Sequence, residues 1–507
     1  MRRALQGIGL VIALTLVVLA ELYFVQGMRI VTTGNMQYKG ISWGSERRRH
    51  DDEIEASRAR QRAQAATSPP ARVEAPGGST EAPSGAPVAT PAAAPLAKSG
   101  ADPEIRPEIS SGIKPPVSYW TDFRGPNRDG VYSEAAISTD WPAQGPPRLW
   151  KQPIGGGYAS ISFGEGRAYT IEQRRDKEAI TAYDPETGRE LWAFTYPADF
   201  DEVLGGPGPR ATPVYRGGLV YSLGANGDLY ALAAATGKPK WLKNILTDNA
   251  ATNKHWAMAG SPLVLEDKVI VTPGGPTSGG GGRSIVAYNR ETGAPAWHSL
   301  NDRAGYTSPI LADLAGRKQI VWISAERAVG IAPEDGKLLW EYPFPAGMDM
   351  NCSQPMAVDE SHVLLSSSDA GGAAMLEVSK DGDKYAAREI WKTNRFKNKF
   401  NSSVIRDGYA YGFDEAILAC IDLKTGELKW KGGRYGYGQL LLAGDHLVVT
   451  TEEGDVVLVK AAPDGFHEVT RFPAVEGKTW NIPAIDHGLL LVRNTTEMTC
   501  FRIGRTL

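Results

Sequence analysis

Short runs of alternating apolar and polar residues, separated by turn-forming residues, follow one another along the chain from Val117 to Leu507. In ATPVYRGGLVYSLGANGDLYAL, residues 211–232, three such runs are separated by glycine-containing turns. Alternation with a period of two over so few residues predicts half-buried β-strands, and the turns predict antiparallel hairpins. This part of the chain is therefore predicted to be all-β.

A closing motif recurs at the end of each set of runs. It reads AYDPETGRELW from Ala182 and returns as ALAAATGKPKW, AYNRETGAPAW, GIAPEDGKLLW and CIDLKTGELKW. A small residue begins each copy, a glycine follows a Thr or Asp near its centre, and a Trp ends it. Repeated sets of four short strands with turns between them are the pattern of β-propeller blades.

The spacing of the closing aromatic residues indicates the number of blades. They are Trp192, Trp241, Trp297, Trp340, Trp391, Trp430 and Phe472, which are 49, 56, 43, 51, 39 and 42 residues apart. These spacings are close to the roughly 40 to 50 residues of a blade. One strand, PPRLWKQ with Trp150, stands alone before them, and the C-terminal WNIPAIDHGLLLVRNTTEMTCFRIG holds three strands and no fourth. We therefore predict an eight-bladed propeller in which the N-terminal strand completes the last sheet and leaves no open edge.

The recurring motif is interpreted as structural. Its glycine supplies the positive φ that a tight turn between the third and fourth strands requires, and its Trp is expected to pack between neighbouring blades. The residues with this role are Gly188, Trp192, Gly237, Trp241, Gly293, Trp297, Gly336, Trp340, Trp391, Gly426 and Trp430. Cys420 and Cys500 occupy the small-residue position in blades that are not neighbours. We expect these two and Cys352 to be free thiols.

Residues 1–26 are predicted to be a targeting segment. Two arginines precede GIGLVIALTLVVLAELYFVQ, which is about long enough to cross a bilayer. The length of this run favours an uncleaved, single-pass membrane anchor with the propeller on the extracytoplasmic (periplasmic) side. A signal-peptidase site after Ala20, which would release a secreted form, is the alternative.

Residues 27–116 are predicted to form a disordered tether rich in Ala and Pro. From Gly44 to Ser118 there is no Phe, Tyr or Trp, so the segment cannot bury enough apolar surface to offset the entropy of ordering. Only the densely charged stretch from Glu46 to Gln64 suits a short helix. The predicted domains are thus 1–26, 27–116 and 117–507.

Composition excludes several functions. The chain has 55 Lys and Arg residues and 58 Asp and Glu residues, which give a net charge of −3. Nucleic-acid-binding proteins usually carry an excess of positive charge, which this chain lacks. Three cysteines without a CxxC or CxxCH pattern exclude a zinc ribbon and attached c-type haem. His255 and His298 each lack a second ligand, and DFRGPNRDG (Asp122–Gly130) lacks the spacing of a calcium loop, so it is interpreted as a structural turn. No metal site is predicted, and we expect a monomer that contacts the membrane through its N-terminal helix.

The xDxxTGxxxW signature, the eight blades and the closing strand resemble the PQQ-like β-propeller superfamily. That group includes quinoprotein alcohol dehydrogenases and the propeller lipoprotein of the outer-membrane barrel-assembly machinery. WTDFRGPNRDG, GPRATP and LLVRNTTEMTC further resemble bacterial PQQ-binding-like propeller repeat proteins. The resemblance implies either a binding or scaffold module or, as the alternative, a dehydrogenase of alcohols or sugars that holds PQQ with calcium.

The enzymes of this superfamily resemble one another in an adjacent Cys-Cys disulfide, a calcium held by acidic and amide side chains, and an Asp base. This chain has no adjacent Cys pair, so we assign no catalytic residue and prefer the binding module.

Loops that join an outer strand to the next inner strand emerge on one face of a propeller, around its channel. Here they carry cationic, amide and aromatic side chains suited to a small anionic ligand or a protein or peptide partner. The candidate rim is Tyr158, Arg210, His255, Trp256, Arg303, Tyr306, Asn351, Gln354, Lys399, Asn401, Tyr435, Tyr437, Gln439, Lys478, Trp480 and Asn481. The alternative is that these residues only satisfy loop backbone and cap the channel. As exposed charges, the rim cations are expected to contribute little to stability.

Overall fold

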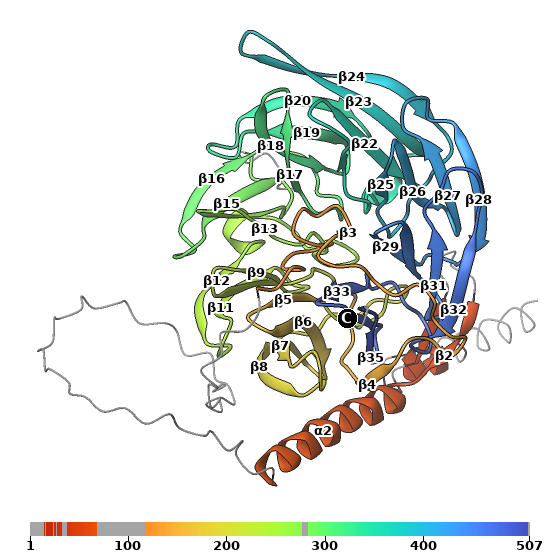
Figure 1. Ribbon diagram of the computed structural model, residues 1–507. Coiled ribbons are helices and arrows are strands. Elements are labelled where there is room, and N and C mark those ends of the chain that lie inside the picture. The colour runs from red at the N-terminus through yellow and green to blue at the C-terminus, as the bar shows by residue number, and fades with distance from the viewer. Residues whose placement is uncertain are drawn as a thin grey trace, which may run out of the picture.

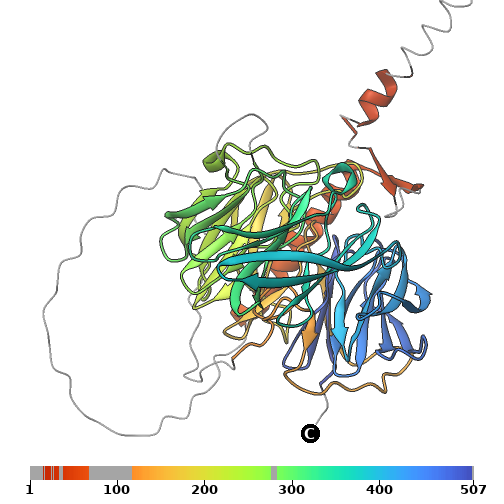
Figure 2. The same cartoon turned by 90° about the horizontal axis from the view of Figure 1, so that it is seen from above.

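The computed structural model describes residues 15, 17–23, 25–26, 28–32, 38–67, 117–275 and 282–504. Eight sheets, each with four antiparallel strands and one of them extended by a fifth, parallel strand, are arranged as blades around a central channel, which Figure 1 shows close to face-on. Turned by 90° in Figure 2, the same sheets are seen from above. The predicted all-β, eight-bladed propeller is confirmed.

The first four blades follow the chain in order, each from the inner strand to the outer strand. They are β5 (Ser162–Gly164), β6 (Arg167–Arg174), β7 (Lys177–Tyr183) and β8 (Glu190–Pro197); β9 (Val214–Arg216), β10 (Leu219–Leu223), β11 (Asp228–Ala233) and β12 (Pro239–Asn244); β13 (Leu263–Val264), β14 (Lys268–Val271), β15 (Ile285–Asn289) and β16 (Pro295–Ser299); and β17 (Ile310–Leu314), β18 (Arg317–Ile323), β19 (Arg327–Ile331) and β20 (Leu338–Pro343). Short 3-10 helices, η1 (Thr247–Asn249) and η2 (Gly347–Asp349), lie in the loops after β12 and β20.

The remaining four blades complete the ring. They are β21 (Met356–Ala357), β22 (His362–Ser367), β23 (Gly372–Asp381) and β24 (Lys384–Thr393); β25 (Val404–Arg406), β26 (Tyr409–Asp414), β27 (Ile417–Asp422) and β28 (Leu428–Arg434); β29 (Gln439–Ala443), β30 (His446–Thr450), β31 (Asp455–Lys460) and β32 (Glu468–Pro473); and β33 (Ala484–Asp486), β34 (Leu489–Arg493), β35 (Glu497–Arg502) and β4 (Arg148–Pro153).

The ring closes as the sequence predicts. Strand β4, although it precedes every blade, pairs antiparallel with β35 and becomes the outer strand of blade eight. In this pairing Trp150 lies opposite Cys500, just as Trp430 lies opposite Cys420 in blade six. The cysteines are free, and Cys420 and Cys500 are buried. The small side chains at these positions leave room for the indole on the neighbouring strand.

Four Trp residues of the repeat, and Trp150 of the closing strand, pack against the glycine turn of the next blade, as predicted. Gly237 has a φ of 69°, and a Cβ at this position would lie 2.7 Å from the Trp192 ring. The Trp192 Nε1–H donates to the Ala234 carbonyl at 2.9 Å, which fixes the indole on the turn. The same glycine contact is made by Trp150 on Gly188, Trp241 on Gly293, Trp297 on Gly336 and Trp391 on Gly426. Trp340 differs, because its Nε1–H donates to Gln319 within its own blade.

Residues 117–130, which we call the plug, fill the central channel. Trp120 is fully buried, and β3 (Val131–Tyr132) then pairs in parallel with the inner strand β29. Arg124 donates to the Ser403 carbonyl at 2.6 Å, whereas Arg128 donates to the Pro309 carbonyl at 2.8 Å and forms an ion pair with Asp122 at 2.7 Å. A buried guanidinium is tolerated only when its donors are satisfied, so these bonds hold the plug to blades four and six. DFRGPNRDG is thus a structural turn.

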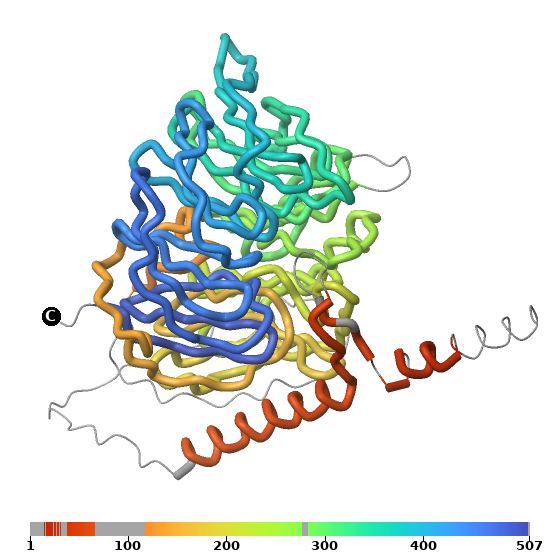
Figure 3. The backbone as a smooth tube through the Cα atoms, turned by 90° about the vertical axis from the view of Figure 1, so that its right-hand side faces the viewer, coloured from red at the N-terminus to blue at the C-terminus, as the bar shows by residue number. Residues whose placement is uncertain are grey.

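A hairpin before the plug corrects the prediction of a tether over its length, whereas the helix that follows it agrees with the helix expected over Glu46–Gln64. Strands β1 (Arg29–Thr32) and β2 (Tyr38–Ser42) pair antiparallel, and α2 spans Gly44–Thr67. Figure 3 shows α2 lying along the outside of the ring. The helix docks through polar and charged side chains, so the lack of aromatic residues did not prevent its ordering. Residues 68–116 of the predicted tether lie outside the described residues.

The predicted membrane anchor is not tested by the structure. Among the described residues, no helix is both long enough and apolar enough to cross a membrane. Residues 1–14, together with 16, 24 and 27, lie outside the described part of the chain. The anchor and the cleavage site after Ala20 therefore stay predictions.

Candidate functional site

A cavity of about 180 Å³ opens on the face where the outer-to-inner loops emerge. Its polar ring comes from residues at the start of inner strands. Ser160 N–H donates to Thr212 Oγ1, Thr212 N–H to Ser261 Oγ, and Ser261 N–H to Ser308 Oγ, each at 2.9 Å. These bonds join blades one to four at the channel, so Ser160 and Ser308, which line the cavity, are held in fixed positions.

Aromatic side chains form most of the cavity wall. The Trp480 ring lies 5.2 Å from that of Tyr158 and 4.6 Å from that of Phe400, measured between centroids. Across the cavity, Trp256 and Tyr306 meet edge to face at 5.7 Å. Contacts of this geometry stabilise aromatic pairs beyond their buried area. The wall is therefore a rigid apolar surface built from blades that are distant in sequence.

The plug contributes to the cavity from below. Phe123, at the tip of the plug, lines the cavity together with the loop residues. Its neighbours Asp122 and Arg124 are buried: Asp122 pairs with Arg128 of the plug, and Arg124 donates to the Ser403 carbonyl of blade six, so the position of the Phe123 ring is fixed from both sides. The channel therefore ends in an aromatic floor.

Arg210 is not the exposed rim charge that we expected. Its side chain is only 8% exposed, pairs with the equally buried Glu202 at 3.3 Å, and donates to the Gly206 carbonyl at 2.9 Å. The guanidinium also lies 4.6 Å from the Phe200 ring centroid. Glu202 accepts further bonds from the backbone N–H groups of Leu204 and Gly205. Arg210 is thus the centre of a structural network that shapes the loop at residues 199–208.

The other rim cations have acidic or carbonyl partners. Arg303, 59% exposed, contacts Asp349 and Glu326 at 3.3 Å each, and Lys399 lies 3.7 Å from Asp369. Lys478 donates to the Leu204 carbonyl at 2.7 Å and lies 4.5 Å from the Trp480 ring centroid. Burial lowers the pKa of Lys478 to about 8. The cations are largely neutralised, so this face is not a strongly positive surface.

The predicted amide residues support the ring from within. All are buried, and their side-chain N–H groups donate to neighbouring loops: Asn351 to Ser324 and Phe344, Asn401 to Gly438, Gln439 to Phe400, and Asn481 to Gly157 and Ala159. Gln354 Oε1 accepts from Arg124 of the plug. These five residues hold the loops in place and do not line the cavity.

The predicted aromatic and histidine residues separate into two groups. Tyr158, Trp256, Tyr306 and Trp480 line the cavity. Tyr435 and Tyr437 are buried and do not line it, and their hydroxyls donate to Glu468 and Glu415. His255 is exposed and packs edge-on against Trp256. Together with Arg210 and Lys399, six of the sixteen predicted rim residues meet at the cavity.

Sequence reasoning missed several cavity residues. Phe400 lies between the predicted Lys399 and Asn401, and its loop position was a usable signal. Glu202, Met350 and Cys352 also stand in outer-to-inner loops. Phe123 could not be found in this way, because nothing local indicates that the plug turns back into the channel.

The cavity residues do not match the set expected for a PQQ site. Cys352 is a single thiol, and burial raises its pKa to about 12, so it is protonated at neutral pH. Glu202 is occupied by Arg210 and two backbone N–H groups. The volume of about 180 Å³ is below the roughly 300–1,000 Å³ of typical cofactor pockets. We therefore derive no chemistry through this cofactor.

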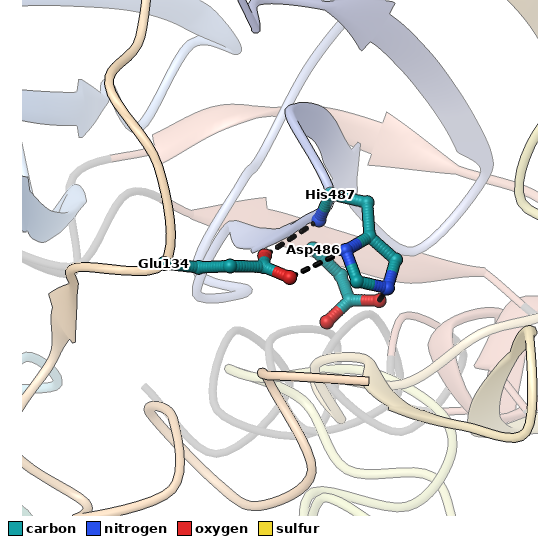
Figure 4. Close-up of side chains that lie close together, drawn as sticks. All are labelled: Glu134, Asp486 and His487. Carbon is teal, nitrogen blue, oxygen red and sulfur yellow. Dashed lines mark hydrogen bonds and ion pairs between the residues drawn. The ribbon is translucent and has the colours of Figure 1, made fainter. Parts of the chain in front are cut away.

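A second polar cluster lies where the segment after the plug meets blade eight, shown in Figure 4. His487 lies between Glu134 and Asp486; its backbone N–H donates to Glu134 at 2.8 Å, and its Nε2 is 3.9 Å from Asp486 Oδ2. Asp486 Oδ1 also accepts the N–H groups of Tyr119 and Trp120 at 2.6 and 2.9 Å. These contacts tie the plug to blade eight, so we interpret the cluster as structural.

Comparison with known proteins supports the propeller assignment. A family model described as outer membrane protein assembly factor BamB matches residues 176–432, about half of the chain. The chain is 22% identical to outer membrane protein assembly factor BamB of Burkholderia pseudomallei (strain K96243) over 61% of its own length and 75% of that protein. It is 28% identical to a quinohemoprotein alcohol dehydrogenase of Comamonas testosteroni over 33% of its length, but spans only 27% of that relative.

Solved structures agree on the fold. BamB from Moraxella catarrhalis superposes with a TM-score of 0.52 and 15% identity, covering 71% of this chain and 98% of that one. Quinohemoprotein alcohol dehydrogenase ADHIIG from Pseudomonas putida HK5 gives a TM-score of 0.55 and 13% identity, covering 77% and 81%. The eight blades, the repeated Trp–Gly contact and the match over half of the chain show that this protein belongs to the PQQ-like β-propeller family described as outer membrane protein assembly factor BamB.

Proposed function

We propose that this protein is a binding module outside the cytoplasm whose cavity takes one large apolar or aromatic side chain of a protein or peptide partner. The observation that carries the proposal is the aromatic wall of Tyr158, Trp480 and Phe400 above the Phe123 floor. Rigid aromatic surface around a concave site is the composition of a binding hot spot.

The size and charge of the cavity support a side chain over the small anionic ligand that the sequence also suggested. An engineered apolar cavity of about 150 Å³ holds a benzene molecule, so about 180 Å³ suits one ring-sized group. The pairing of Arg210 with Glu202 and of Lys399 with Asp369 leaves little net positive charge for an anion.

The extracytoplasmic location is part of the proposal. It is supported by the apolar N-terminal run and by the outer-membrane role that the names of the BamB relatives state. The membrane anchor remains the expected means of attachment, since its length suits a bilayer.

Short peptides test the binding site directly. Acetylated Ala-Trp-Ala, Ala-Asp-Ala and Ala-Ala-Ala amides are titrated into the full chain, and binding is followed by saturation-transfer NMR. One hot-spot side chain contributes about 2–4 kcal/mol, so we expect the Trp peptide to bind with a Kd of about 1–30 mM and the other two to bind much more weakly.

Variants locate that binding. Trp480→Ala is expected to abolish measurable binding, whereas Tyr385→Ala, on the distant β23–β24 hairpin, leaves it unchanged. Equal binding of the three peptides, or full binding by the Trp480 variant, contradicts the proposal. The dehydrogenase alternative predicts instead that PQQ and Ca²⁺ support alcohol-dependent dye reduction, which is lost when the metal is removed.

A further inference from the structure

Helix α2 is fixed to the seam between blades eight and one, where the ring closes. Arg58 is 2% exposed and donates to Gln152 at 2.9 Å and to the Pro153 carbonyl at 3.0 Å, both in β4. The same guanidinium pairs with Glu190 of β8 at 3.2 Å, and Gln61 donates to Gln152 at 2.8 Å. Helix α2 therefore bridges blade eight and blade one, and a buried charge with these partners holds it there.

The hairpin before α2 reaches the loops around the cavity. Arg47, at the start of α2, contacts Asp201 at 3.0 Å and Asp199 at 3.3 Å, and Arg29 of β1 contacts Asp201 at 3.4 Å. These acidic residues belong to the loop that supplies Glu202 and Leu204 to the cavity. On the blade-seven side, Lys39 of β2 pairs with Glu453 at 2.5 Å. The hairpin thus contacts two loops on the cavity face, one from blade one and one from blade seven.

The apolar segment ends at this same hairpin. Arg29 donates to the Tyr23 carbonyl at 3.2 Å and lies 4.3 Å above the Tyr23 ring. The Gly44 N–H donates to the Gln26 carbonyl at 3.1 Å. Within this segment, Val17 and Val25 are 64% and 69% exposed, and apolar surface left open in this way marks contact with a membrane or a partner.

We infer that residues 28–32 and 38–67 form a bracket that holds the cavity face of the propeller toward the membrane in which the apolar segment lies. The partner side chain of the proposed function, on which this inference rests, would then come from a protein segment at the membrane surface. A flexible chain of some 90 residues has an average end-to-end distance of roughly 50 Å, so it would let the propeller move that far from the membrane and take any orientation. The bracket replaces that freedom by one fixed orientation.

Lipid quenching distinguishes the two faces of the propeller. Blade strands of about six residues separate the faces by about 20 Å. In the full chain with Cys352→Ser, a fluorophore is attached at Glu476→Cys, in the cavity-side loop after β32, or at Asp407→Cys, in the opposite-face turn after β25. After reconstitution into phosphatidylcholine–phosphatidylglycerol vesicles that carry headgroup nitroxides, we expect quenching at residue 476 and none at residue 407.

Breaking the bracket tests its role. Arg47→Ala should reduce the difference between the two labels, and Arg58→Ala should abolish it, whereas Arg388→Ala, which removes an exposed ion pair on blade five, should leave it intact. Because Arg58 is buried, Arg47→Ala provides the readout if the Arg58 variant fails to fold. Equal quenching at both positions of the vesicle-bound protein would overturn the bracket, and so would failure of the chain to bind vesicles. Neither result affects the peptide titration, which tests the proposed function separately.

Discussion

The substitution Gly188→Ala tests how the ring is held together at its seam. Gly188 has a φ of 73°, and an added Cβ would lie 2.7 Å from the Trp150 ring, which belongs to blade eight. An Ala in the left-handed region costs about 1–2 kcal/mol. Displacing the indole adds an overpacking cost of about 1–3 kcal/mol and the loss of the Trp150–Pro185 hydrogen bond about 1 kcal/mol. We expect a total loss of about 3–6 kcal/mol in the free energy of unfolding.

Gly382→Ala is the matched control. Gly382 has a φ of 57°, and an added Cβ there would meet nothing within 4 Å, so only the backbone strain applies. Urea denaturation of both variants, followed by near-ultraviolet circular dichroism, should show a loss of about 1–2 kcal/mol for Gly382→Ala. If the two variants lost the same stability, the Trp–Gly contact would not hold neighbouring blades together, and our reading of the repeat would be refuted.

Three further predictions concern buried polar groups. Burial raises the pKa of Glu178 to about 7, above its ordinary 4.5. The free energy of unfolding should therefore fall by about 3 kcal/mol as the pH rises from 4.5 to 7. Urea titrations of Glu178→Gln should no longer show this pH dependence. Arg210→Ala leaves Glu202 buried without its cation and should lower the free energy of unfolding by about 3–5 kcal/mol. Arg303 is exposed, so Arg303→Ala should change the free energy of unfolding by less than about 1 kcal/mol. Thermal melts of both variants measure these changes. The Cys352 thiol, with a pKa raised to about 12, should react with iodoacetamide at pH 8 far more slowly than a free cysteine peptide, and an equal rate would contradict this raised pKa.

The cavity was only partly predictable, and particular residues show why. Trp256 and Trp480 could be placed on one face because every loop from an outer to an inner strand emerges on the same side of a propeller. The state of Arg210 could not be predicted, since its exposure depends on how Glu202 and Phe200 fold over it. Phe123 reaches the cavity only because Arg124 and Arg128 anchor the plug to blades that begin more than a hundred residues later.

Local patterns along the chain were enough to predict the blades, their number and the closure of the ring. Strand alternation, the positive φ at glycines such as Gly188, and the Trp ten residues after the small residue are local features that repeat with the blade. The docking of α2, the filling of the channel and the neutralisation of the rim cations could be seen only in the folded chain. Those features depend on charge pairs and packing between segments far apart in the chain, such as Arg58 with Glu190, and no local pattern records which distant partner a side chain will meet.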